Sequence, residues 1–166
     1  MAHTAALPVA QPAPPGLWVI HCDGSAIPNP GRMGLGATLL APDGQQHTLS
    51  HTSSLVGCNN EAELRALMAA LRQAHALGAR AIAVRSDSSL LIEQLRPPQP
   101  GQRPAAPIAR LAELFYSARA WLARFDSVQW QWIPRHRNSA ADTLARAALG
   151  APAKVAPHPS HKKKKR

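Results

Sequence analysis

The order in which strand-like and helix-like patterns follow one another constrains the fold of this chain most. Three extended runs come first, between residues 17 and 57, and the turn residues Asp43 and Gly44 separate the second from the third. From residue 59 onward, runs with helical periodicity alternate with short apolar runs. The expected order is strand, strand, strand, helix, strand, helix, helix, strand and helix. It predicts an α/β domain in which a mixed sheet is flanked by helices.

Individual elements are placed by their periodicity. The first strand is predicted from Leu17 to Cys22, because the turn-forming sequence GSAIPNPG follows at residues 24–31. The most regular helix is predicted within residues 59–80 and ends near Gly78. Strand alternation and helical spacing predict places in the core for Trp121, Val128, Trp130 and Trp132.

The two ends of the chain differ in composition from its middle. Residues 1–16 are rich in Pro and Ala and are expected to form a disordered leader, and residues 151–166 a disordered basic tail, around one domain at 17–150. The leader lacks a signal-peptide pattern, and no segment approaches the roughly 18 consecutive apolar residues of a membrane span. A soluble, cytoplasmic protein is expected. Cys22 and Cys58 are expected to be reduced and packed as small hydrophobic residues.

Acidic residues are scarce in this chain. It carries 19 Lys and Arg against 9 Asp and Glu, a formal net charge of +10, which favours a polyanionic partner such as nucleic acid or anionic lipid. Four acids are predicted to lie on solvated surface: Asp43, Glu93, Glu113 and Asp126. The other five fall at predicted strand ends or helix starts: Asp23, Glu61, Glu63, Asp87 and Asp142.

Each of these five acids, taken alone, has a structural interpretation. Glu63 follows Asn60 by three residues, and Asp142 follows Ser139 by three, so each pair has the spacing of a capping box. Asp87 has the position of a helix cap, and Asp23 that of a residue in an Asx turn.

Taken together, four of the acids indicate a metal centre. Asp23 and Asp87 are predicted to end strands that a mixed sheet places near one another, and two predicted helix starts add Glu63 and Asp142. Four converging negative charges are unfavourable without cations, and oxygen-only ligands favour Mg²⁺ or Mn²⁺. Two such ions about 3.5 to 4 Å apart support phosphodiester cleavage.

Four motifs in order, DGSAIPNPGRMGLG, NNEAELRAL, SDSSLL and RNSAADTLARAAL, give residues 17–150 a specific resemblance. The chain resembles type I ribonuclease H. The resemblance implies a five-stranded mixed sheet, with an antiparallel meander of three strands plus two parallel strands, flanked by helices. It also implies endonucleolytic hydrolysis of the RNA strand of RNA–DNA hybrids with two Mg²⁺ ions, leaving 5′-phosphate and 3′-hydroxyl ends.

The resemblance also assigns roles to residues. It places Asp23 on the acid that bridges both ions, Glu63 and Asp87 on the pair that holds the second ion, and Asp142 on the acid of the ion that activates water. Glu61 is then a favourable charge at a helix N-terminus. The implied substrate-binding positions are Gly24, Ser25, Asn29, Asn59 and Ser89.

Two features depart from better-studied bacterial members of that family. The segment PRHRNSAAD is short and offers Arg135 and His136, either of which could assist proton transfer or product release. The Pro-rich sequence RPPQPGQRPAAP stands where many members carry a basic protrusion. Affinity for the hybrid is therefore expected partly from the basic tail, and deletion of residues 151–166 is predicted to raise KM at low salt while leaving kcat nearly unchanged.

Other functions remain open at this point. The same scaffold could be a non-catalytic module that binds RNA–DNA hybrid or double-stranded RNA, although four carboxylates aimed at phosphates argue against it. A different nuclease on this fold, or cleavage of double-stranded RNA beside hybrid, are further alternatives. A monomer is expected, because no extra apolar face is evident.

Overall fold

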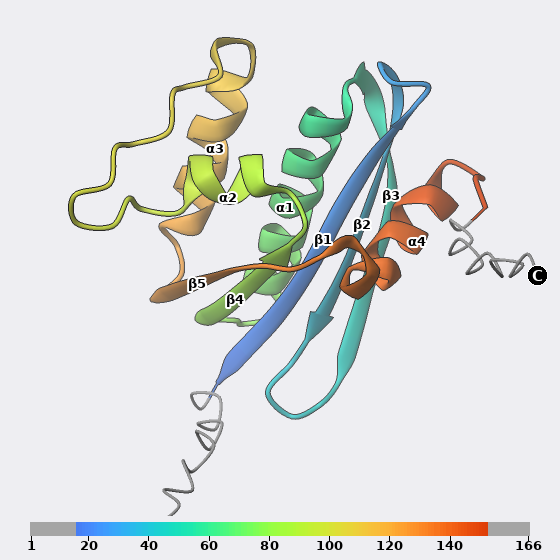
Figure 1. Ribbon diagram of the computed structural model, residues 1–166. Coiled ribbons are helices and arrows are strands. Elements are labelled where there is room, and N and C mark those ends of the chain that lie inside the picture. Colours follow the sequence, from blue (N-terminus) through green and yellow to red (C-terminus); the bar gives the residue numbers. More distant parts are fainter. Residues whose placement is uncertain (1–15, 153–166) are drawn as a thin grey trace, which may run out of the picture.

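The computed structural model describes residues 16–152, and its elements follow the predicted order (Figure 1). The predicted leader and basic tail lie almost entirely outside these residues. The strands are β1 (Leu17–Ile27), β2 (Gly31–Leu40), β3 (Gln46–Gly57), β4 (Ala81–Ser86) and β5 (Ser127–Trp132). The α-helices are α1 (Asn59–Ala76), α2 (Ser89–Leu95), α3 (Ala112–Leu122) and α4 (Ser139–Ala148), and the short 3₁₀ turns are η1 (Ala109–Leu111) and η2 (Arg135–Arg137).

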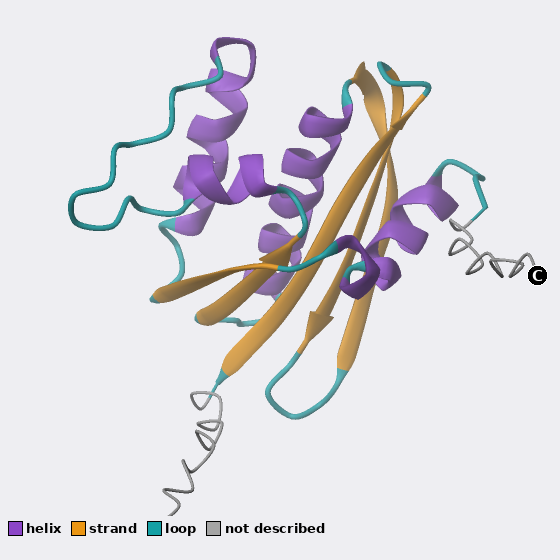
Figure 2. Cartoon of the chain, viewed as in Figure 1, coloured by secondary structure: helices purple, strands orange, loops and turns teal. Residues whose placement is uncertain are grey.

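The five strands form one mixed sheet in the order β3-β2-β1-β4-β5. β1, β2 and β3 pair antiparallel, whereas β4 pairs parallel with both β1 and β5. α1 packs on one face with α3 beside it, and α4 packs on the other face against β1, β2 and β3 (Figure 2). The expected fold class is confirmed. Within residues 16–152 no helix has the length and apolar character needed to cross a bilayer.

The first strand is longer than predicted. β1 stays extended as far as Ile27 because it pairs with β2 from Val19 onward, ending with Ile27 opposite Arg32. Its pairing with β4 ends earlier, at His21 opposite Arg85. Asp23 therefore lies inside a strand, and the prediction that it follows a strand end was wrong. It does lie just beyond the point where β4 stops running beside β1.

Two glycines let helices contact the sheet backbone directly. A side chain at Gly24 would collide with the backbone of Ala62 and Glu63 in α1. A side chain at Gly36 would collide with the backbone of Ala141 in α4. Because Gly36 is the partner of Asp23 in the β1–β2 ladder, this contact also shows that Asp23 lies on the α4 face.

The tryptophans divide into core and surface residues. Trp121 and Trp130 are partly buried and pack against the hydrophobic core, as predicted, and so does Val128. Trp132 is 56% exposed, so the prediction that it belongs to the core was wrong. It is the last residue of the edge strand β5, and its indole Nε1 donates a hydrogen bond to the carbonyl oxygen of Asp87 at 3.2 Å.

Candidate active site

Four acids come together where β1 and β4 part. Asp23 lies on β1, Asp87 follows β4, and Glu63 and Asp142 lie near the starts of α1 and α4. Burial and, after it, the negative charges of Asp87, Asp142 and Glu63 raise the pKa of Asp23 to about 8, although the hydrogen bond from the Gly24 N–H acts to lower it. The sheet and the two helices that cover it thus bring these carboxylates within electrostatic reach of one another.

The pKa of Glu63 is also raised. Burial raises its pKa, and the charge of Asp87 adds to that rise. The Ser88 hydroxyl and the Arg135 guanidinium act in the opposite direction. The net upward direction shows that the nearby cation does not compensate the burial of this carboxylate.

The acids do not act as helix caps in the structure. α1 and α4 have no side-chain hydrogen bond at their N-caps, Cys58 and Asn138, so neither predicted capping box forms. In α2 the N-cap is Ser88, whose hydroxyl accepts from the Leu91 N–H at 3.2 Å, which leaves Asp87 without a capping function. The acids are therefore not explained by helix capping.

The Asx-turn interpretation of Asp23 is met only in part. Its Oδ1 accepts a hydrogen bond from the Gly24 N–H at 2.9 Å. The backbone there is an extended, paired strand and not a turn. This local bond orients the Asp23 side chain without reversing the chain.

Asn138 is a site residue that the sequence analysis missed. Only 2% of it is exposed, and its Nδ2 donates to the Cys22 carbonyl at 2.9 Å and to Asp87 Oδ1 at 2.6 Å. Its own Oδ1 is buried and has no hydrogen-bond partner in the described structure. One amide thus ties the start of α4 to β1 and to the Asp87 carboxylate. Its position before a helix is that of an ordinary cap, so no local signal in the sequence indicated this role.

The segment between β5 and α4 surrounds Asp87. Arg135 Nε lies 3.6 Å from Asp87 Oδ2, with the Arg135 side chain 85% exposed and that of Asp87 only 12%. His136 follows Arg135 in η2 and is exposed. Arg135 therefore contacts the acid cluster directly, whereas no described hydrogen bond connects His136 to it.

The predicted substrate-binding positions form one group and one outlier. The Asn59 N–H donates to Asn29 Oδ1 at 3.1 Å, and Asn59 Oδ1 accepts from the Ala26 N–H at 2.8 Å, which fastens the β1–β2 turn to the start of α1. Ser25 lies on β1 two residues after Asp23 and is half-buried on the same face. Ser89 is exposed at the start of α2, and no described hydrogen bond connects its side chain to the other positions.

Comparison with known proteins supports the family resemblance that the sequence motifs indicate. Residues 21–148 match the family model described as reverse transcriptase-like. A Ribonuclease HI of Halobacterium salinarum is 34% identical over 143 residues, which covers 85% of this chain and 68% of that protein. The chain belongs to the type I ribonuclease H family. The solved RNase H1 structure from the same archaeon, 32% identical, superimposes with a TM-score of 0.72 over 81% of this chain and 98% of that one.

Two further relatives extend this picture. The "Bifunctional protein Rv2228c" of Mycobacterium tuberculosis is 36% identical over 140 residues, which are 83% of this chain but only 37% of that protein. Its N-terminal RNase H domain, 34% identical, gives a TM-score of 0.70 over 81% of this chain and 94% of that one. LC11-RNase H1, solved in complex with RNA/DNA hybrid, is 28% identical with a TM-score of 0.67 over 80% and 96% of the two chains. This chain thus spans little more than a third of the length of that mycobacterial relative.

The acid cluster fits divalent cations by its chemistry. Its donors are carboxylate oxygens, the pKa of Asp23 is raised by its acidic neighbours, and the buried Asn138 Oδ1 lacks a partner. Within residues 16–152, however, no three carboxylate, histidine or cysteine side chains stand close enough together to form a metal-binding group.

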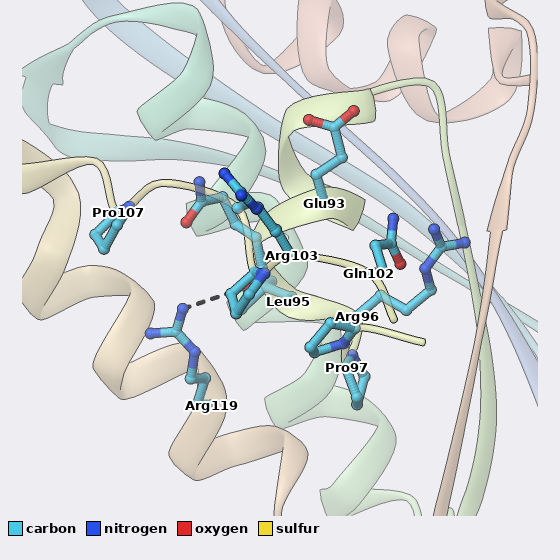
Figure 3. Close-up of a pocket in the computed structure, with 12 residues that line it drawn as sticks. Glu93, Leu95, Arg96, Pro97, Gln102, Arg103, Pro107 and Arg119 are labelled. Carbon is cyan, nitrogen blue, oxygen red and sulfur yellow. Dashed lines mark hydrogen bonds between the residues drawn. The ribbon is translucent and has the colours of Figure 1, made fainter. Parts of the chain in front are cut away.

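The loop between α2 and η1 forms a cavity of about 580 Å³ (Figure 3). Arg119 Nη2 donates to the Gln94 carbonyl at 3.2 Å, and Gln94 Nε2 donates to the Ala106 carbonyl at 2.7 Å, so α2, α3 and the loop are fastened together. The Pro-rich loop itself supplies Arg96 and Arg103 to the lining of the cavity. The fold adds Arg119 from α3, so three arginines line the cavity beside Glu93.

The two cysteines of the chain differ in burial and in the pKa of the thiol. Cys22 is buried in the core, as predicted, and burial together with the nearby acids raises the pKa of its thiol. Cys58 is only half-buried, and Arg110 Nη1 lies 3.0 Å from its Sγ. Burial alone would raise the Cys58 pKa, but the bonds from Arg110 and nearby N–H groups lower it. The prediction that Cys58 packs as a small hydrophobic residue was wrong.

Proposed function

We propose that this chain is an endoribonuclease that hydrolyses the RNA strand of RNA–DNA hybrids at the acid cluster, leaving 5′-phosphate and 3′-hydroxyl ends. The observation that carries the proposal is the convergence of Asp23, Glu63, Asp87 and Asp142, seen in the raised pKa of Asp23. A protein that only bound nucleic acid would gain nothing from aiming four carboxylates at phosphates. The hybrid-bound structure of LC11-RNase H1 supports hybrid as the substrate.

Each residue of the cluster has a distinct part in this proposal. Mg²⁺ or Mn²⁺ ions, when bound, would supply the charge that activates water and stabilises the leaving oxygen. Asp23 is central because all three other acids influence its carboxylate, and it would share both ions. Glu63 and Asp87 would hold one ion, and Asp142 the other. Asn138 keeps Asp87 Oδ1 in a fixed position.

Residues around the cluster would position the substrate. The Asn29–Asn59 pair presents polar groups at the β1–β2 turn, and Gly24 with Ser25 offers backbone and hydroxyl groups beside Asp23. Contacts of this kind with the 2′-hydroxyl distinguish RNA from DNA. Arg135, exposed beside Asp87, is placed to contact a phosphate or to help the product leave.

The test is a cleavage assay on three labelled duplexes: RNA–DNA hybrid, double-stranded RNA and double-stranded DNA, each with Mg²⁺, Mn²⁺ or EDTA. The wild-type chain is expected to cut the RNA strand of the hybrid only with a divalent cation. Asp23→Asn should lower kcat by about 10³-fold or more, because the loss of a shared ligand removes several kcal/mol of charge stabilisation. The control Asp126→Asn, which changes an exposed acid paired with Arg80, should cleave like the wild type.

Three results of this assay would contradict the proposal in different ways. Cleavage that survives both EDTA and Asp23→Asn would exclude the metal mechanism. Binding of hybrid without cleavage would indicate a binding module. Equal or faster cleavage of double-stranded RNA would show that hybrid is not the preferred substrate.

A further inference from the structure

One part of the sheet next to the acid cluster has no helix over it. α4 packs against β1, β2 and β3, and in Figure 2 the face of β4 and β5 on the same side as α4 carries no helix. The residues of this face follow from the register. His21 pairs with Arg85, Arg85 pairs with Gln131, and Asp23 on the same face of β1 lies two residues beyond His21. A polar row made of His21, Arg85 and Gln131 therefore crosses three strands beside the acids.

Arg85 is the unexplained member of this polar row. It is half-buried, and its Nε is buried without a hydrogen-bond partner among the described residues. Of the ion pairs found within residues 16–152, none includes Arg85. A charged guanidinium with one N–H withdrawn from water and without an acceptor or a counter-charge is costly, which indicates that an anion belongs beside it.

The neighbours of Arg85 favour an anion over a cation. On this face of the two strands the other residues are Ala81, Ala83, Ser127, Gln129 and Gln131, and none of them is acidic. The nearest carboxylate along β4, Asp87, already accepts a hydrogen bond from Asn138 and lies beside Arg135. The charge of Arg85 is thus available, and the two glutamines beside it can donate further hydrogen bonds.

We propose that the polar row of His21, Arg85 and Gln131 binds a backbone phosphate of the strand that is cleaved, next to the phosphate held at the acid cluster. The inference rests on the proposed function, because it uses the same nucleic acid. The spacing supports it: two residues of strand separate the polar row from Asp23 and Asp87, about 7 Å. Successive phosphates of one strand are separated by a comparable distance. Arg is suited to this contact because its planar fork matches phosphate oxygens.

A first experiment measures hybrid affinity at several salt concentrations in EDTA, where cleavage is prevented. Arg85→Met keeps the apolar stem of the side chain and removes its charge. It is expected to weaken binding about tenfold and to reduce the slope of log K against log salt by about 1, whereas Arg85→Lys should keep most of the slope. The matched control Arg72→Met removes a charge from an exposed residue of α1 and should change neither quantity appreciably.

A second experiment identifies the phosphate. Hybrids carry one uncharged methylphosphonate linkage, moved stepwise along either strand. The wild type should lose affinity when the linkage adjoins the scissile position in the cleaved strand. The affinity of Arg85→Met, which already lacks the charge that contacts this phosphate, should not fall further when the linkage is placed there. Equal losses of affinity in the wild type and in Arg85→Met at that position would overturn the proposal. A difference between the two proteins that appears only when the linkage is in the uncleaved strand would also overturn it.

These results separate the inference from the proposed function. If the wild type cleaves hybrid but Arg85→Met binds like Arg72→Met, only the polar row is excluded as a phosphate site. If the wild type neither binds nor cleaves hybrid, both proposals are wrong. Circular dichroism spectra of the variants show whether a binding loss comes from misfolding.

Discussion

The acid cluster and the arginine-lined loop cavity are built in opposite ways. The cluster takes one carboxylate from each of four separate segments, which backbone pairing and glycine contacts hold in place. The cavity takes its three arginines from one loop and the helices beside it, and its charged side chains are exposed. Buried charges that repel one another can drive chemistry, whereas exposed charges on a loop can only add affinity. The difference predicts that changes in the cluster act on kcat and changes in the cavity on KM.

The largest expected effect concerns the buried charge of Asp23 in the absence of metal. Below pH 4 its carboxyl is protonated in both the folded and the unfolded chain. As pH rises, the unfolded chain ionises first, near the ordinary value of 3.8, and the folded chain only near 8. The unfolded state therefore binds fewer protons over this interval, so stability falls as pH rises from about 4 to about 8, by a few kcal/mol.

Urea unfolding in EDTA between pH 4 and pH 9 measures this effect. The difference in unfolding free energy between Asp23→Asn and the wild type should grow with pH, with the variant more stable at the alkaline end. Using the difference between the two proteins removes the contributions of the other titrating groups. Parallel pH curves for the two proteins would show that the folded chain does not resist ionisation of Asp23.

The second prediction concerns Asn138, which fixes a carboxylate without belonging to the four acids. Asn138→Ala removes the hydrogen bonds to Cys22 and Asp87 and should lower kcat or metal affinity by about 10- to 100-fold. Isothermal titration with Mg²⁺ and steady-state kinetics measure the two quantities separately. Asn138→Asp keeps the shape but adds a fifth acid, so it should also impair activity. Normal Mg²⁺ affinity and kcat in Asn138→Ala would reduce its role to packing.

The third prediction concerns Gly36, where α4 meets the sheet. Gly36→Ala places a methyl group against the Ala141 backbone, so α4 must move and carry Asp142 with it. The expected cost is about 1 to 3 kcal/mol in unfolding free energy, together with a fall in kcat. Gly44→Ala is the matched control: it has open space but a φ of +89°, so it should lower stability without lowering kcat. Equal kcat values in the two variants would show that α4 does not position Asp142.

The fold was predicted correctly, and the four acids were selected as candidates, because their signals in the sequence are local. Each of Asp23, Glu63, Asp87 and Asp142 interrupts or borders a regular pattern, and the order of patterns placed those borders at one edge of a sheet. The extended end of β1 was missed because residues 24–27 look like a turn until β2 pairs with them. Pairing between distant strands overrode local turn propensity there.

The remaining features could not be predicted, because they depend on contacts between distant segments. Asn138 bonds to Cys22, 116 residues away, and nothing in its local sequence distinguishes it from a helix cap. Trp132 follows the same alternation as Trp130, but it is the last residue of β5 and is exposed there. The arginine-lined cavity needed α3 to bring Arg119 to the loop. Local periodicity carries no information on contacts between segments that are far apart in the sequence.

The smallest expected effect tests the other half of the comparison, the loop cavity. The double variant Arg96→Gln and Arg103→Gln removes two exposed charges and leaves Arg119, which fastens the loop, in place. Because exposed charges contribute little each, KM for hybrid should rise only a few-fold at low salt, and the rise should vanish at high salt. The value of kcat should not change, since neither arginine touches the acids.

A matched double variant, Arg72→Gln and Arg124→Gln, removes the same charge from α1 and from the end of α3. If both double variants raise KM equally, the general positive charge of the chain accounts for the affinity and the cavity has no special role. If the loop variant lowers kcat, the two regions are coupled through α2, which begins two residues after Asp87 and ends at the cavity. A KM effect confined to the loop variant would instead support the division of labour, with chemistry held by buried carboxylates and affinity by exposed arginines.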